Sequence, residues 1–298
     1  MRPIRPTSVL LLVLSISLAP GFSLLLSSQG GSIFAQSTKS SSQSMWSFLT
    51  EGNFEPIMEG SYGYGLFDNK LFISDLPKTG VLGLKLGYRE IMPFKTWGKS
   101  LDERFLAGEY AKSTVPPGKA NSGGMDGEWW RVSTGQRSGY GWAIGNQSII
   151  PFHQYAFGYS EAKFTNITSL GSEDSARVAR VMGAGRLSMS TEGGATVELF
   201  SSLSASAGYE ASIIYTRLVF PQWICSYLLL GSSVVIISDF AKNIVSTSPV
   251  LGPILYFVLR NAVAYSFFYA FRGEMNWPFP SETPFMTHTF KIDVSIRF

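Results

Sequence analysis

The chain ends with the stretch Thr287-His288-Thr289-Phe290-Lys291-Ile292-Asp293-Val294-Ser295-Ile296-Arg297-Phe298. Because successive side chains of a β-strand point to opposite faces, this alternation predicts a strand with one apolar and one polar face. An unpaired strand edge invites association with other chains, whereas a closed barrel has no edge. The pattern therefore predicts that this strand closes a β-barrel by pairing with the first strand. Its apolar face would hold Phe290, Ile292, Val294, Ile296 and Phe298.

A final strand of alternating apolar residues ending in Phe298 resembles the C-terminal signature of bacterial outer-membrane β-barrel proteins. The resemblance implies an antiparallel membrane β-barrel in the outer membrane of a Gram-negative bacterium, in contact with the lipid bilayer. It also implies that the outer-membrane barrel assembly machinery recognises the apolar face of this strand. The alternative is an amphipathic strand that closes a soluble β-sandwich.

The composition favours a protein that contacts lipid. Of the 298 residues, 14% are aromatic and 15% are charged, with a mean hydropathy of +0.13. Ordinary domains contain about 25% charged residues. The net charge of +3, with no basic run, argues against a nucleic-acid partner. The single cysteine, Cys225, excludes an intramolecular disulfide, and its apolar surroundings in the sequence predict a buried side chain.

The N-terminal region predicts a secretory signal peptide at residues 1–35. Arg2 and Arg5 precede an apolar run at 9–18, and small residues around Ala35 suit a cleavage site. The alternative is an uncleaved membrane anchor.

The remaining chain divides into two predicted parts. Residues 36–53 are rich in serine and predict a polar linker. Residues 54–298 predict the barrel, with a helical insert at 221–272 before the final strand.

Several further segments alternate large apolar residues with glycine or charge, as the strands of membrane barrels do. The pattern predicts a barrel of about eight strands, within a range of roughly 8–12. The segments are 59–67, 81–88, 128–134, 140–145, 153–164, 177–190, 195–203 and 209–220. Residues 135–139 and 191–194 predict turns. Residues 89–127 break the pattern and predict a long polar loop with a short helix near 101–110.

Aromatic residues near the predicted turns suggest the lipid–water boundary, where membrane barrels carry aromatic belts. The alternative is a stacking platform for a sugar or a base. The expected interfacial aromatics are Trp129, Trp130, Tyr140, Trp142 and Trp277.

Two apolar segments, 222–238 and 253–271, do not alternate and predict a helical hairpin. Arg260 and Asn261 interrupt the second segment, and a charge in mid-membrane costs a few kcal/mol. The alternative is an inner-membrane protein in which both helices span and a β domain lies in the periplasm.

The interruption favours a hairpin packed against the barrel, either plugging its lumen or capping its periplasmic mouth. Arg260 and Asn261 would then contact polar lumen side chains such as Glu198 or Glu210.

The sequence predicts no catalytic residue, no metal site and no cofactor. The two histidines, His153 and His288, are far apart, and no zinc-ligand spacing occurs. The alternative follows from the resemblance, because some outer-membrane barrels are lipid-modifying enzymes that pair a histidine with a serine. His153 with Ser148 or Ser160 could form such a pair, as could His288.

The sequence therefore predicts a non-enzymatic outer-membrane barrel with a structural, binding or narrow-channel role and a lumen occluded by the helical insert. The lipid bilayer and the assembly machinery are the expected partners. Other protein partners and any ligand remain open at this point.

Overall fold

The computed structural model describes residues 54–120, 124–167 and 170–298. The expected signal peptide at 1–35 and the expected linker at 36–53 lie outside the described residues. Residues 56–298 form one unit.

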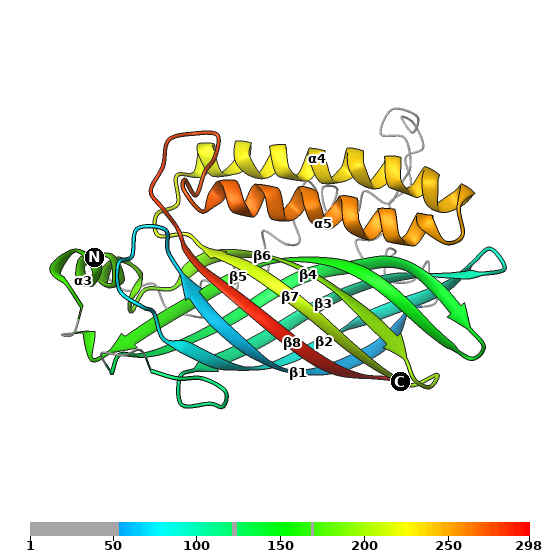
Figure 1. Ribbon diagram of the computed structural model, residues 1–298, viewed down its shortest axis with the longest axis horizontal. Coiled ribbons are helices and arrows are strands. Elements are labelled where there is room, and N and C mark those ends of the chain that lie inside the picture. Colours follow the sequence, from blue (N-terminus) through cyan, green and yellow to red (C-terminus); the bar gives the residue numbers. More distant parts are fainter. Residues whose placement is uncertain (1–53, 121–123, 168–169) are drawn as a thin grey trace, which may run out of the picture. The chain divides into compact units, whose positions relative to one another are not determined.

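Eight antiparallel strands form a closed barrel in which each strand pairs with its neighbour in sequence and β8 pairs with β1 (Figure 1). In this register Phe290 of β8 lies opposite Tyr64 of β1 and Tyr209 of β7. The predicted strand number and closure are confirmed. The strands are β1 (Glu55–Asp68), β2 (Lys78–Phe94), β3 (Gly98–Lys112), β4 (Asp126–Ile144), β5 (Gln147–Thr165), β6 (Arg186–Glu198), β7 (Leu203–Ile214) and β8 (Phe285–Arg297).

The two ends of the barrel differ in the length of their connections. Short turns at 95–97, 145–146 and 199–202 join strands at the end where β8 finishes. Long connections at 69–77, 113–125, 166–185 and 215–284 leave the opposite end. The third of these holds the short helix α3 (Ser172–Val181), which lies at that end in Figure 1. We name the two ends the short-turn end and the long-loop end.

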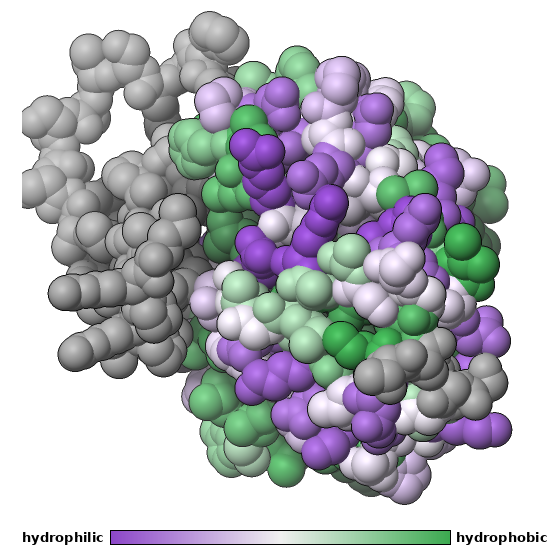
Figure 2. All heavy atoms as spheres, turned by 90° about the vertical axis from the view of Figure 1, so that its left-hand side faces the viewer, coloured by the Kyte–Doolittle hydropathy of each residue, from purple (hydrophilic) through white to green (hydrophobic). Residues whose placement is uncertain are grey.

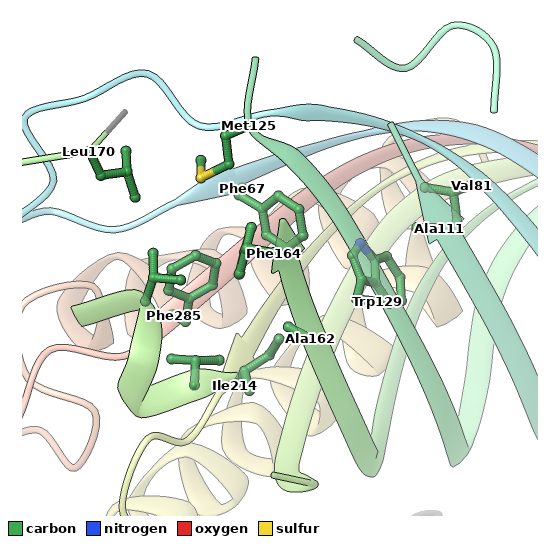
Figure 3. Close-up of a cluster of buried hydrophobic side chains, with 12 residues drawn as sticks. Phe67, Val81, Ala111, Met125, Trp129, Ala162, Phe164, Leu170, Ile214 and Phe285 are labelled. Atoms are coloured by element: carbon green, nitrogen blue, oxygen red, sulfur yellow. The ribbon is translucent and has the colours of Figure 1, made fainter. Parts of the chain in front are cut away.

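A cluster of apolar side chains fills the barrel at the long-loop end (Figure 3). Phe67, Phe164 and Phe285 meet there with ring centroids 4.9 to 5.5 Å apart. Val178 and Val181 of α3 are buried in the same cluster. We name this group the mouth cluster; its other buried members are Val81, Ala111, Met125, Trp129, Ala162, Leu170 and Ile214.

Two long helices, α4 (Phe220–Thr247) and α5 (Leu251–Phe271), form the predicted hairpin before β8. The hairpin lies along the outside of the barrel wall, with α5 against β4 to β7 and α4 packed on α5 (Figure 1). The expectation that it plugs the lumen or caps a mouth is wrong. The prediction of a buried Cys225 is also wrong, because this residue lies exposed on α4.

The predicted loop at 89–127 is mostly strand. β2 continues to Phe94 and β3 covers Gly98–Lys112, so only 113–125 is a connection and no helix forms at 101–110. Charges obscured the strand pattern because β3 carries them on both faces. Glu103 points into the lumen. Asp102 lies on the outer side, where it is buried and accepts a hydrogen bond from Gln136.

Three other local predictions are wrong. β4 runs unbroken through 135–139, and β6 runs through 191–194. The glycines there permit close approach: a Cβ on Gly139 would lie 2.1 Å from the Pro151 carbonyl oxygen of β5. The predicted strand at 177–190 begins instead as α3, whose first turn carries Glu173 and Asp174, the acidic residues that favour a helix N-terminus.

We expect the mouth cluster to be a major source of stability. Phe164→Ala removes a ring that is 3% exposed, and such a deletion lowers the free energy of unfolding by about 3 to 5 kcal/mol. Phe200→Ala is the matched control, because this ring is 68% exposed in the β6–β7 turn, and surface changes stay within about 0.5 kcal/mol. Urea unfolding in lipid vesicles, followed by tryptophan fluorescence, measures both. Equal effects would contradict the assignment.

Candidate functional site

The lumen side of the barrel is lined by charged residues, whereas the apolar partners in the same strands point outward. On β2, Lys85 and Arg89 are buried while Leu84 and Leu86 are about half exposed on the outer wall. On β8, Lys291 and Asp293 are buried while Ile292 is 66% exposed. This arrangement is the reverse of a soluble barrel, in which the apolar face is inside.

Arg137 of β4 is at the centre of the first group of lumen charges. It is fully buried, and its guanidinium donates to both carboxylate oxygens of Glu59 at 3.0 and 3.1 Å. Its Nε donates to Gln154 at 2.9 Å, and the guanidinium carbon lies 4.2 Å from the centroid of the Phe152 ring. Such bidentate, charge-assisted bonds fix the position of both groups.

Lys85 and Arg89 extend this group around the lumen. Lys85 Nζ donates to Glu59 at 2.5 Å, and Arg89 Nε donates to Glu103 at 2.8 Å. Arg89 also donates to hydroxyls of two strands on the far side, Ser204 at 2.7 Å and Ser295 at 2.9 Å. Side chains of β1, β2, β3, β7 and β8 are therefore joined across the interior.

A second group of charges lies nearer the long-loop end. Lys291 Nζ donates to Glu109 at 2.5 Å and to Glu210 at 2.8 Å. Arg131 also donates to both of these carboxylates, and its distance to Glu210 is 2.5 Å. Lys291 Nζ also lies 3.7 Å from Glu192, which is itself 3.7 Å from Arg137, so the two groups form one lumen network.

Side chains of the lumen network line a small cavity. A cavity of about 20 Å³ lies among these side chains, lined by residues that include Glu59, Glu192 and Lys291. That volume holds roughly one water molecule. The mouth cluster closes one side, and Leu101, Ile150 and Phe152 pack together on the other. The side chains of the lumen network come from the barrel strands, and the helices lie outside the wall.

A second polar cluster lies outside the barrel, between α5 and the wall. Arg260 donates to Ser138 of β4 at 2.6 Å and to the Tyr256 hydroxyl, and Asn261 Oδ1 lies 3.0 Å from His153 Nδ1 of β5. We name these contacts the α5 seam. Arg260 and Asn261 therefore contact polar barrel side chains, but the expected partners were wrong. Glu210 belongs to the lumen network, and Glu198 pairs with Lys99 at 2.6 Å.

The candidate histidine–serine pairs on β5 do not form. His153 faces α5, whereas Ser148 and Ser160 lie at even positions of the same strand and face the lumen. Ser148 donates to Glu198, and Ser160 donates to Ser188 at 2.7 Å.

His288 has a different environment on the outer wall near the long-loop end. Its Nδ1 lies 2.7 Å from the Tyr209 hydroxyl oxygen, and its Nε2 lies 3.5 Å from Asp68. Arg272, just after α5, also pairs with Asp68 at 2.8 Å. These contacts form a chain from hydroxyl to imidazole to carboxylate, which the sequence did not indicate because β1, β7 and β8 bring them together.

The five expected interfacial aromatics occupy different positions. Trp129 is 2% exposed and belongs to the mouth cluster inside the barrel (Figure 3), so it does not reach the outer wall. Trp130 and Tyr140 are half-buried on the outer side, where Tyr140 packs against Tyr256 of α5. Trp142 donates from Nε1 to the Pro249 carbonyl at 2.9 Å, and Trp277 is 38% exposed.

The apolar face of β8 points outward as predicted. Its side chains are between 42% and 70% exposed; they are Phe290, Ile292, Val294, Ile296 and, just beyond the strand, Phe298. Recognition of this face by the assembly machinery stays a prediction.

We expect Arg137 and Glu59 to be strongly coupled. Arg137→Met removes the two charge-assisted hydrogen bonds that Glu59 accepts from the guanidinium and leaves the lumen network with an excess of buried negative charge. We therefore expect the free energy of unfolding to fall by about 3 to 5 kcal/mol. Adding Glu59→Gln should recover part of that loss, giving a coupling energy of about 1 to 3 kcal/mol. A double-mutant cycle by urea unfolding in vesicles measures it.

The matched control is the partly exposed pair Lys112–Glu128, 3.2 Å apart, whose side chains are 38% and 34% exposed. Exposed pairs couple by less than about 1 kcal/mol. Equal coupling in the two cycles would show that the lumen network does not hold the interior together.

No family model matches the sequence, and no curated protein matches it. Among solved structures, the chain is similar to Neisserial surface protein A, with 8% identity, a TM-score of 0.39, and coverage of 82% of this chain and 97% of that one. It is also similar to Ail, the attachment invasion locus protein of Yersinia pestis, with 10% identity, a TM-score of 0.33, and coverage of 82% and 99%. The strand order and register of this chain establish its barrel independently of these similarities.

Proposed function

We propose that this protein is an outer-membrane β-barrel with a closed lumen and a structural or binding role. The observation that carries the proposal is the apolar outer wall around the charged lumen network. On β2 alone, Leu82, Leu84, Leu86 and Tyr88 are 46% to 51% exposed in succession. Large contiguous apolar surfaces are rare on soluble monomers, whereas lipid-facing strands alternate in this way.

The spacing of outward aromatics on β4 supports the same proposal. Trp130 and Tyr140 are ten positions apart on one strand, which is about 33 Å at 3.3 Å per residue. With a strand tilt of about 40°, their separation along the barrel axis is about 25 Å, close to the height of the apolar band of outer-membrane barrels. Trp130 would then lie at the level of one lipid–water boundary and Tyr140 at the level of the other, where it packs against Tyr256 of α5.

The unequal connections support an orientation. Outer-membrane barrels have short periplasmic turns and longer extracellular loops. The short-turn end would therefore face the periplasm, and the long-loop end with α3 would face outward. Figure 2 looks onto the long-loop end, where several hydrophilic patches lie among hydrophobic residues. With the closed lumen that we propose, a binding role would belong to this outer face.

Cell fractionation with a heat-shift gel tests the proposal. We expect the protein in the outer-membrane fraction, with unboiled and boiled samples migrating differently because a closed barrel resists SDS until heated. Ile292→Pro is the control, since proline removes a donor from a central strand ladder and should abolish the shift.

Two outcomes would contradict different parts of the proposal. Recovery in the inner membrane without a shift would refute the outer-membrane barrel. A protein that shifts but conducts ions in planar bilayers would keep the location and refute the closed lumen.

A second candidate function is acyl transfer from a phospholipid to water at His288. The chain Tyr209–His288–Asp68 favours it, because a histidine held by a carboxylate can act as a general base. For this function we expect release of fatty acid from radiolabelled phospholipid to be lost in His288→Ala and retained in His153→Ala. Absence of release by the unmodified protein would exclude it.

A further inference from the structure

The outward surface of the hairpin is apolar along its length. On α4, Leu228, Leu229 and Ile236 are 40% to 68% exposed, and on α5, Ile254 and Val258 are 42% and 48% exposed. Both helices are long and apolar enough to cross a membrane. A helix that is apolar on the side away from its packing partner needs a second apolar environment.

The apolar lengths match a bilayer. α5 has 21 residues, about 31 Å at 1.5 Å per residue. On α4, the first charged residue is Asp239, which lies 3.6 Å from Lys242. The uncharged part, 220–238, is therefore about 28 Å long. The hydrocarbon core of a bilayer is about 30 Å thick.

The hairpin extends between the same two ends as the strands. Its loop lies at the short-turn end, where Trp142 donates to Pro249 and Lys95 of the β2–β3 turn donates to Ser246. The C-terminal end of α5 lies at the long-loop end, where Arg272 pairs with Asp68, the last residue of β1. The apolar stretch of each helix thus lies beside the apolar outer wall.

The contacts of the α5 seam keep the charge of Arg260 away from lipid. Arg260 is the only charged residue of α5, near its middle, and it is 8% exposed. Its bonds to Ser138 and Tyr256 turn it toward the wall and away from the outer surface. Gly193 of β6 permits this approach, because a Cβ there would lie 2.5 Å from Asn261 Oδ1.

We infer that the α4–α5 hairpin crosses the same bilayer as the barrel, outside the wall, with its outward face against lipid acyl chains. The inference rests on the proposed function. The membrane perimeter is then part strand and part helix, and the polar side chains of the α5 seam are shielded from lipid by α5.

Labelling at single cysteines tests this arrangement in the full chain. Three proteins are made in a Cys225→Ser background, each with one new cysteine: Ile236→Cys on α4, Leu84→Cys on β2 or Ile73→Cys in the β1–β2 loop. Each cysteine is labelled with a fluorescent maleimide. The native residues are 68%, 51% and 87% exposed. Each protein is reconstituted in phosphatidylcholine vesicles with nitroxide-labelled lipid, or with iodide in the water.

We expect the Ile236→Cys label to behave like the Leu84→Cys label, with strong quenching by lipid and several-fold weaker quenching by iodide than the Ile73→Cys label. The native Cys225, exposed on α4, gives a second position without any substitution if Ile236→Cys does not fold.

The other outcomes separate the inference from the proposed function. Iodide access at α4 with lipid contact at Leu84→Cys overturns the inference and leaves the barrel in the membrane. Iodide access at both sites overturns the proposed function. Protection of the α4 label from both quenchers means that a protein surface, such as a second copy of this chain, covers the hairpin, and this too overturns the lipid contact.

Discussion

The pairing of β8 with β1 is the constraint on which the rest of the structure depends. Once these strands pair, every strand has two neighbours and the sheet has an inside and an outside. Inward-pointing groups are cut off from water, so each inward charge needs a partner of opposite sign. The lumen network meets this requirement with residues from most strands of the barrel. Barrel closure and charge pairing therefore depend on each other. The charged side chains find their partners only when the strands pair in this register, and the paired charges stabilise that register.

An interior built from ion pairs has a different character from an apolar core. Replacing buried pairs by apolar residues is often neutral or favourable for stability, whereas removing one partner is costly. Here Arg137, Glu59 and their neighbours hold several strands in one register by directional bonds. The mouth cluster, at the long-loop end, adds a conventional apolar contribution where α3 meets the barrel. Both groups of side chains lie inside the barrel, and this placement supports the proposed closed lumen.

The hairpin determines where the outer wall can carry polar side chains. Where the wall is bare, the outward residues in the middle of β2 and β8 are apolar, as in 82–88 and 290–296. Beneath or beside α5, the outward positions include Ser138 and His153, which bond to helix residues. The wall can be polar there because α5 covers it and supplies partners. The same cover explains why Arg260 can lie in the middle of an apolar helix.

The sequence by itself determined the features that rest on local periodicity. Alternation in 287–298 and 81–88 predicted the strands and their outward faces, and the unbroken apolar runs predicted the two helices, because these periods need no knowledge of distant residues. Tertiary structure decided the rest. The sequence did not predict β3, because its charged residues lie on both faces of the strand and hide the alternation. The glycines at 193–194 suggested a turn, but they lie within β6, where residues from other parts of the chain approach the backbone closely. The lumen network and the α5 seam join residues up to 206 positions apart, as in Arg89 and Ser295. Only the closed barrel, and the hairpin lying against it, bring such pairs within bonding distance.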